Sequence, residues 1–337
     1  MANVCTQCFA DKELVAFIRS QSIFDECTFC GTKSVPCIAL EELHDFFSEL
    51  VGHFQIDHKG MTLKSTLQGN WSLFNSLDTA YKVLNNVLSA IKASISHADE
   101  LVSFSGTIQE NVGYWDVLKS KLILENRYIT DVSYLTDELG WDGFFNSQIE
   151  IPQGTSLYRA RVHQNSGENP YESKDMFCPP ANRSTAGRAN PSGIPYLYLS
   201  DNPETILYEI RASYLDEISI GTFKLKSTIN KPVLISDFTE SSTIFHPNRV
   251  GDKIKSTILK QRVSADLSKP MRRYDSELDY IPTQFICEFI KIYTGVHGIK
   301  FRSSLHVTGN NFVIFDQQLM DCTEVKQVKI QSVKITV

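Results

Sequence analysis

The sequence predicts an α+β protein in three parts, and three observations carry this prediction. Five of the eight cysteines fall within the first 37 residues, residues 38–148 show helical periodicity, and residues 149–337 alternate strand-like runs with short helices. The first pattern is typical of a metal site, the second of a helical bundle, and the third of a mixed or mainly antiparallel sheet. A chain of 337 residues is long enough for two or three domains with real cores.

Composition limits the class of protein. The formal net charge is −6, with 42% hydrophobic and 21% charged residues. A net anion is not attracted to nucleic acid or to an anionic membrane surface, so a general binder of either is disfavoured, although a local basic face stays open. No run approaches 18 apolar residues, and the first residues lack the layout of a secretory signal. We therefore expect a soluble, cytoplasmic protein that does not contact membranes.

The first part, residues 1–37, is expected to be a zinc-ribbon module. Its cysteines follow the spacing C-x2-C-x18-C-x2-C, which suits a four-thiolate zinc site formed by Cys5, Cys8, Cys27 and Cys30. Gly31 follows the second pair, where such a turn often needs a positive φ. The alternatives are four reduced cysteines with this spacing by chance, or redox chemistry, which the absence of a βαβ pattern disfavours.

The role expected for this zinc is structural. A module of about 35 residues cannot bury enough apolar surface to fold alone, and the metal supplies the missing free energy. We expect Cys37 to pack at the edge of the module without binding metal. The module could also contact a partner or nucleic acid, and we favour a partner.

Residues 38–148 are expected to form a small helical bundle. Apolar residues recur at steps of three and four in 39–54 and in 70–91, and less regularly in 113–129. The histidines of this region lie singly, without a consistent spacing to a partner, and we expect surface or capping roles for His44, His53, His58 and His97.

The sequence pattern changes near residue 148, and residues 149–337 are expected to form a separate domain. At its start, β-branched and aromatic residues follow Pro and Gly, which is typical of strands. In "LYRARV", Arg159 and Arg161 fall on one side of a strand. An arginine fork suits a pyrophosphate or a carboxylate, although a solvent-facing stripe is a common alternative. Arg188 lies in a loop of small residues, where Gly187 and Gly193 allow close approach to a phosphate.

The stretch "PYLYLSDNPETILYEI" predicts a strand followed by a helix. Alternation buries Leu197 and Leu199 and presents Tyr198 on the other face. A helix then begins at Pro203, with Asn202 or Asp201 as its cap.

On this helix Thr205 and Glu209 are four residues apart and share a face. Glu209 is therefore a candidate carboxylate in a pocket. The alternative is a solvent-facing glutamate paired with Arg211 or a lysine.

Near the end of the chain, a helix is expected at about 283–293, followed by a strand that ends at Ser303 and Ser304. Serines at strand ends are usually caps or turn formers. His297 and His306 are close in sequence, but no G-x-S-x-G elbow exists, so no hydrolase triad is indicated.

Taken in order, "LYRARV", "GRANPSGIPYLYLSDNPETILYEI", "PTQFICEFIK" and "GIKFRSSLHVTGNNFVIFD" resemble the RES domain, named for an arginine, a glutamate and a serine. The resemblance covers about residues 155–320. It implies an ADP-ribosyltransferase-like fold and degradation of NAD by hydrolysis or phosphorolysis, often in a toxin restrained by an antitoxin. Partners so implied are NAD and an antitoxin or regulatory protein, and a homodimer is a further possibility for the helical region.

The resemblance also implies site residues. The family arginine falls on Arg159, its loop arginine on Arg188, its aromatic on Tyr198, its glutamate on Glu209 and its serine on Ser303. Arg159, Arg188 and Tyr198 would bind NAD, together with Asn190 of the loop. Arg159, Tyr198, Glu209 and Ser303 would be catalytic.

Two positions depart from the pattern. The residue after the first arginine, often tyrosine, is Ala160, and the loop motif G-R-W/F-N is here Gly187-Arg188-Ala189-Asn190. These departures affect the aromatic lining of the pocket, not its charged residues. The front half more loosely resembles the HEPN-like regions of larger RES proteins. It lacks an R-x4–6-H ribonuclease motif, so it is expected to be non-catalytic.

The implied activity is cleavage of the nicotinamide–ribose bond of NAD by a toxin or antiphage defence effector. Glu209 would stabilise the cationic ribose, the arginines would hold the pyrophosphate, Tyr198 would orient the nicotinamide, and Ser303 would bond the ribose or carboxamide. A transferase that moves ADP-ribose to a protein or nucleic acid, and a non-catalytic binding module, are the alternatives.

Overall fold

The computed structural model describes residues 2–146, 148–239, 243–270 and 277–333. By contacts the chain forms two compact units, one of residues 1–115 with 241–259 and the other of residues 116–240 with 260–337. The boundary falls within two helices, α5 (Gly106–Leu124) and α8 (Val250–Ser268). The expected three-part division at residues 37 and 148 stays a prediction.

The first unit opens with a small antiparallel sheet that carries the cysteine turns. Its strands are β1 (Asn3–Cys5), β2 (Ile23–Asp25) and β3 (Val35–Ala39), in the order β1-β3-β2. A 3-10 turn, η1 (Thr6–Cys8), and helix α1 (Lys12–Gln21) connect β1 to β2. The helix between the two cysteine pairs is a feature that the cysteine spacing did not predict.

Asp11 joins α1 to a segment far along the chain. Its carboxylate caps the helix by accepting hydrogen bonds from the backbone N–H groups of Glu13 and Leu14. It also accepts from the N–H groups of Ile244 and Phe245, just before α8. A carboxylate that is 3% exposed is thus satisfied by four backbone donors, which is what burial of a charge requires.

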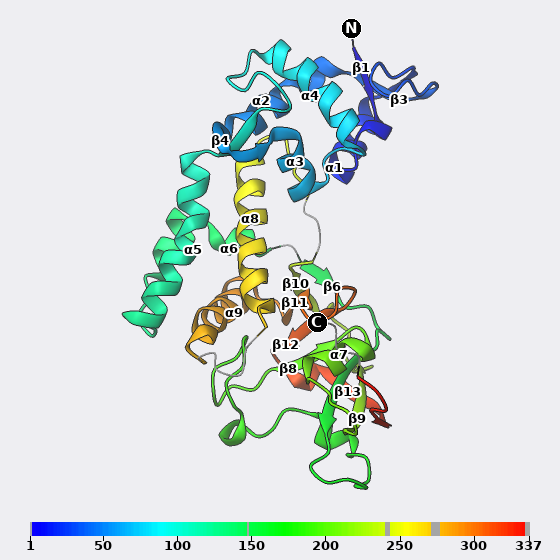
Figure 1. Ribbon diagram of the computed structural model, residues 1–337, viewed down its shortest axis with the longest axis vertical. Coiled ribbons are helices and arrows are strands. Elements are labelled where there is room, and N and C mark those ends of the chain that lie inside the picture. The colour runs from blue at the N-terminus through cyan, green and yellow to red at the C-terminus, as the bar shows by residue number, and fades with distance from the viewer. Residues whose placement is uncertain (1, 147, 240–242, 271–276, 334–337) are drawn as a thin grey trace. The chain divides into compact units, whose positions relative to one another are not determined.

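The rest of the first unit is mainly helical, as the periodicity predicted. It contains η2 (Leu40–Leu43), α2 (His44–Gly52), α3 (Leu63–Trp71), α4 (Leu77–Ile91) and the first part of α5 (Figure 1). Thr62 caps α3 and Ser76 caps α4 through their side-chain oxygens. The antiparallel pair of β4 (Phe54–Thr62) and β5 (Leu101–Phe104), which α3 and α4 connect, was not predicted.

The second unit is built on a mixed eight-stranded sheet of described residues, in the order β13-β9-β7-β8-β12-β11-β10-β6. Adjacent pairs are antiparallel except β10 and β11. The strands are β6 (Gln148–Glu150), β7 (Leu157–Val162), β8 (Leu197–Ser200), β9 (Glu217–Leu225), β10 (Leu234–Asp237), β11 (Gly298–Arg302), β12 (Asn310–Ile314) and β13 (Met320–Lys329). The expected mixed-sheet α+β class is confirmed.

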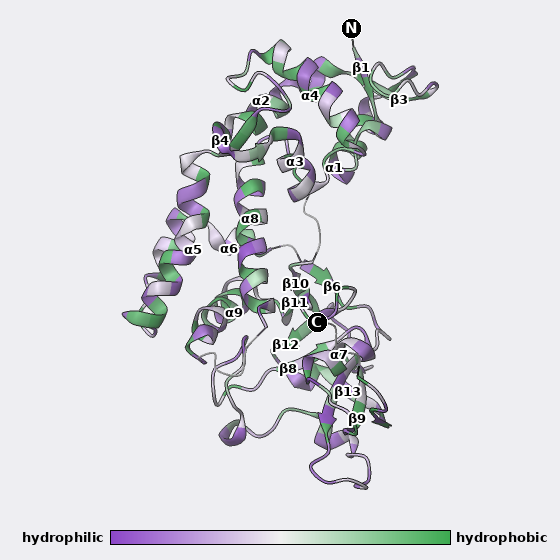
Figure 2. Cartoon of the chain, in the orientation of Figure 1, coloured by the Kyte–Doolittle hydropathy of each residue, from purple (hydrophilic) through white to green (hydrophobic). Residues whose placement is uncertain are grey.

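Helices and short turns complete this unit. Helix α7 (Pro203–Glu209) packs against β7 and β8, and α6 (Trp141–Phe144) packs against α9 (Ile281–Thr294). The shorter helical turns are η3 (Tyr134–Glu138), η4 (Ser173–Met176), η5 (Ala181–Arg183), η6 (Glu277–Tyr280) and η7 (Gln317–Leu319). Figure 2 shows the hydrophobic residues of the central strands and the mixed hydropathy of α5.

One apolar core supports the strands that carry the site. Leu197, Leu199 and Phe312 pack in it with Phe223, Ile235 and Ile314. Because the side chains of a strand alternate between faces, burial of Leu197 and Leu199 leaves Tyr198 on the opposite face of β8. Within the described ranges, no helix is both long and apolar enough to span a bilayer.

Candidate active site and metal centre

Glu209 ends helix α7 and is fixed there by two side-chain donors. The helix begins at Pro203, and the side chain of Asn202 caps it by accepting from the N–H of Glu204. Oε1 of Glu209 accepts hydrogen bonds from Oγ of Ser303 and from Nδ2 of Asn311, both at 2.7 Å. No cation among the described residues pairs with this half-buried carboxylate, so the alternative of an ion pair with Arg211 or a lysine is not what the structure shows.

Ser303 is held by its own turn after β11. Its Oγ accepts from the backbone N–H groups of Leu305 and His306, which leaves the hydroxyl proton for Glu209. The side chain is 7% exposed. Ser303 therefore acts as a strand-end turn former, as its position indicated, and at the same time orients the carboxylate.

A second contact fastens this turn to α7. Oγ1 of the buried Thr205 lies 2.7 Å from Nδ1 of His306, whose ring stacks on Tyr208. Gly309 lies so close to Thr205 that a Cβ at position 309 would overlap the threonine side chain. The glycine is needed for space, and the turn and helix meet closely enough to place Ser303 beside Glu209.

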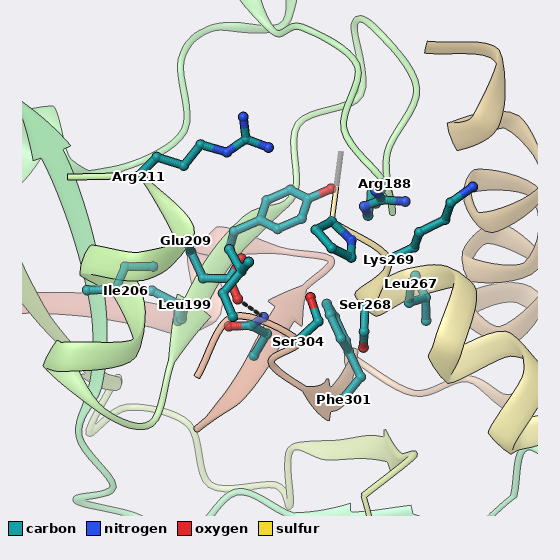
Figure 3. Close-up of a pocket in the computed structure, with 14 residues that line it drawn as sticks. Arg188, Leu199, Ile206, Glu209, Arg211, Leu267, Ser268, Lys269, Phe301 and Ser304 are labelled. Carbon is teal, nitrogen blue, oxygen red and sulfur yellow. Dashed lines mark hydrogen bonds between the residues drawn. The ribbon is translucent and has the colours of Figure 1, made fainter. Parts of the chain in front are cut away.

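Glu209 faces a cavity of about 230 Å³ within the second unit (Figure 3). Charged and polar lining residues come from four parts of the chain: Arg188, Tyr198, Glu209, Arg211, Ser268, Lys269, Ser304 and Asn311. In Figure 3, Arg188 and Lys269 lie on one side of the cavity, and Glu209 and Arg211 on the other. Among the described lining residues, one carboxylate thus lies with several cationic groups, an arrangement suited to a ligand that carries both a phosphate and a developing positive charge.

The loop that carries Arg188 is held through its backbone and through the arginine side chain. The backbone oxygens of Gly187 and Arg188 accept from Gln284 and Thr283 at the start of α9. The guanidinium donates from Nη1 to the carbonyl oxygen of Asp266 at 3.1 Å and lies over the ring of Tyr280, 5.1 Å from its centroid. These partners are neutral, so they fix the side chain without cancelling its charge.

Tyr198 shapes the same loop. Its hydroxyl donates to Oδ1 of Asn190 at 2.8 Å and accepts from the N–H of Ala189 at 2.9 Å. A Cβ at position 187 would lie 2.6 Å from this hydroxyl, so Gly187 is required for the close approach. Burial raises the pKa of Tyr198, which keeps the phenol protonated and able to donate.

Asn190 is 3% exposed, and its amide is engaged by the loop itself. Nδ2 donates to the carbonyl oxygens of Thr185, Pro191 and Ile194, while Oδ1 accepts from Tyr198. The predicted contact of Asn190 with NAD stays a prediction. What the structure shows is a residue that holds the backbone beside Arg188.

Arg159 lies on β7 and does not line the Glu209 cavity. Its Nη1 contacts Sγ of Cys178 at 3.8 Å, and desolvation lowers the pKa of this half-buried arginine. Arg161, on the same face of the strand, donates to the carbonyl oxygen of Phe177 at 2.6 Å. The predicted pyrophosphate contact of Arg159 stays a prediction.

The four N-terminal cysteines come together as the spacing predicted. Their sulfurs all lie within 4.8 Å of one another, with Sγ–Sγ distances of 3.5 Å for Cys5–Cys30 and Cys8–Cys27 and 3.8 Å for Cys5–Cys8. Four thiolates at about 2.3 Å from a tetrahedral zinc ion lie about 3.8 Å apart. The donor set therefore fits a metal ion of this kind.

The backbone of the second turn also suits a metal site. Gly31 has a φ of +71°, and its N–H donates to the carbonyl oxygen of Cys27. A hydrogen bond from the Cys8 thiol lowers the pKa of Cys27. Burial raises the pKa of Cys5, and the hydrogen bond with Cys27 raises the pKa of Cys8. Cys37 is buried nearby, outside the cluster, as expected.

The structure thus brings Glu209, Ser303 and Tyr198 into one site with Arg188, whereas Arg159 and Asn190 do not line the cavity. Sequence reasoning did not single out Asn311 or Lys269, and it named Arg211 only as a possible ion-pair partner of Glu209. The signal for Asn311 was available: it precedes the apolar run "FVIF" on a strand, so it is a polar position at the end where Ser303 lies.

Comparison with known proteins gives the following. No curated protein matches the chain. One solved structure with similarity is the crystal structure of the M. tuberculosis MbcT–MbcA toxin–antitoxin complex, with 12% sequence identity, coverage of 56% of this chain and 92% of that chain, and a TM-score of 0.30. The family model of the RES domain matches residues 156–336, more than half of the sequence. The resemblance seen in the motifs is therefore confirmed, and the chain belongs to the RES domain family.

Proposed function

We propose that this protein cleaves the nicotinamide–ribose bond of NAD. The observation that carries the proposal is the carboxylate of Glu209, oriented by Ser303 and Asn311 in a cavity that also contains Arg188 and Lys269. NAD combines a pyridinium, a ribose and a pyrophosphate, and therefore needs anionic and cationic partners a short distance apart.

In the proposed reaction the bond between ribose C1′ and the pyridinium nitrogen breaks, and its electron pair returns to the ring. Nicotinamide leaves neutral, and the ribose acquires oxocarbenium character. Glu209, beside the sugar, stabilises that charge. Water then bonds to C1′ and releases a proton to solvent, giving ADP-ribose, or phosphate bonds to C1′, giving the corresponding phosphate ester.

The other residues have supporting roles in this proposal. We assign the pyrophosphate first to Arg188, because it lines the cavity and its polar contacts are with neutral groups, whereas Arg159 does not line the cavity. Tyr198 borders the nicotinamide end and holds the Arg188 loop. Ser303 donates a hydrogen bond from its hydroxyl to Glu209, and it therefore orients the carboxylate rather than the substrate.

The cysteine cluster would hold zinc in a structural role. Four thiolates complete a tetrahedral coordination shell and leave no open position for a substrate. Cys5, Cys8, Cys27 and Cys30 would thus stabilise the fold of the first unit. From the RES resemblance we extend to this chain the role of a cytoplasmic toxin, depleting NAD under the restraint of an antitoxin.

Incubation of the purified protein with NAD, followed by chromatography of the products, tests the proposal. Nicotinamide should appear together with ADP-ribose or its phosphate ester, whereas label on a macromolecule would identify a transferase. Glu204→Gln is a matched control for Glu209→Gln, since Glu204 is exposed in the first turn of the same helix. A folded protein that leaves NAD intact would instead favour a binding module.

A further inference from the structure

A second cavity in the same unit shares the cationic wall of the first. Its volume is about 380 Å³, and Arg188 and Lys269 line both cavities. The Glu209 cavity, at about 230 Å³, falls below the range of roughly 300–1,000 Å³ that is usual for small-molecule sites. The first cavity alone is therefore small for a whole dinucleotide.

One wall of the second cavity is a stripe along the C-terminal part of α5. The lining positions follow the spacing i, i+3, i+4, i+7 and i+8, which is one helix face: Asp116, Lys119, Ser120, Ile123 and Leu124. These residues precede the part matched by the RES family, which begins at residue 156. The second cavity is thus completed by sequence that this chain adds to the family domain.

Each of the three acids that the described residues contribute to this cavity has a cationic partner. Lys119 contacts Asp116 at 2.9 Å and Asp266 at 3.0 Å, and Arg262 also contacts Asp116. The pair Lys269–Asp279 is looser, at 3.6 Å, with both side chains about half exposed. Lys269 is therefore free to turn toward an anion at small cost.

Arg188 differs from these residues because no ion pair with a described carboxylate compensates its charge. Its partners are a carbonyl oxygen and an aromatic ring, and no carboxylate in the described part of the chain lies within salt-bridge distance of it. The remaining lining that the described residues provide is apolar or neutral, with Ile123, Leu124 and Pro282 beside Thr283. The second cavity thus combines a nearly neutral lining with the guanidinium of Arg188, which is suited to bind phosphate.

We propose that the second cavity holds the nucleoside half of the dinucleotide that is remote from the scissile bond. The diphosphate lies between the two cavities, against Arg188 and Lys269, and the nicotinamide ribose lies at Glu209. The inference rests on the proposed function and adds a substrate subsite to it. Residues 116–124 of α5 then contribute to the affinity for NAD without touching the bond that breaks.

The test is Ser120→Trp, which places an indole in the second cavity from an exposed helical position. NAD is compared with nicotinamide mononucleotide, which lacks the remote nucleoside. We expect the KM for NAD to rise about tenfold or more, and the ratio of kcat/KM for NAD to that for the mononucleotide to fall by a similar factor. Val117→Trp is the control, because Val117 is also exposed on α5 but does not line the cavity.

Calorimetry with ADP separates this inference from the proposed function. ADP should bind the wild type and Glu209→Gln, and bind Ser120→Trp at least about tenfold more weakly. If the wild type leaves NAD intact but this ADP pattern holds, the proposed function fails and the subsite stands. If Ser120→Trp leaves both the KM for NAD and the affinity for ADP unchanged, the subsite is refuted. Should Ser120→Trp not fold, Leu124→Trp replaces it, since Leu124 is 80% exposed.

Discussion

Glu209→Gln is the substitution that most sharply separates charge from shape at this site. Oε1 of Glu209 accepts hydrogen bonds from two neutral donors, the hydroxyl of Ser303 and the amide of Asn311. A glutamine oxygen accepts the same two bonds, so the variant should fold with a stability within about 1 kcal/mol of wild type. What it loses is the negative charge beside the ribose.

Removal of one such preorganised electrostatic contact typically costs about 3 kcal/mol in the transition state. Since 1.36 kcal/mol is a tenfold change in rate, kcat should fall roughly a hundredfold or somewhat more. Nicotinamide release at saturating NAD measures this, with thermal unfolding as the check on folding. A variant that turns over NAD at a rate near wild type would refute the assignment of Glu209.

Three further predictions test other parts of the structure. Gly309→Ala should destabilise the protein by roughly 1–3 kcal/mol, because the added Cβ overlaps the side chain of Thr205. Adding Thr205→Ala to this variant should restore part of the lost stability. Equal unfolding midpoints for wild type and Gly309→Ala would contradict the close packing. Replacing Cys5 and Cys8 by Ser should abolish binding of about one zinc per chain in a metal assay, whereas Cys37→Ser should retain it; a metal-free native protein would count against the site. A hydrogen bond from the backbone N–H of Gly167 and, to a lesser extent, one from the Lys329 side chain lower the pKa of Glu217 to about 2. The ionised carboxylate therefore stabilises the fold at pH values above its ordinary pKa of 4.5. That contribution should vanish as pH falls from about 4.5 to 2, and the stabilities of wild type and Glu217→Gln should converge over that interval if the assignment is right.

The sequence predicted those features that depend on local spacing. Four cysteines in two pairs predicted one cluster, and alternation in "PYLYLS" predicted buried leucines with Tyr198 on the other face. The cap at Asn202 and the start of α7 at Pro203 followed from ordinary helix rules. Glu209 and Ser303 were placed in one site by the family resemblance, and their hydrogen bond agrees with it.

Features that depend on distant partners could not be predicted. Helix α8 begins near the segment that Asp11 binds, and its apolar pattern is too irregular to indicate a helix of this length. The order β8-β12-β11, which brings Asn311 to Glu209, is a matter of strand pairing rather than of local sequence. The sequence predicted both the strand arginine, Arg159, and the loop arginine, Arg188, as phosphate ligands, and only packing shows that Arg188 reaches the cavity.

A crystal structure of Glu209→Gln grown with NAD tests the proposed site most directly. We expect uncleaved NAD with its nicotinamide ribose beside residue 209 and its pyrophosphate against Arg188. NAD bound elsewhere on the protein, or a cavity that stays empty at saturating NAD, would contradict it.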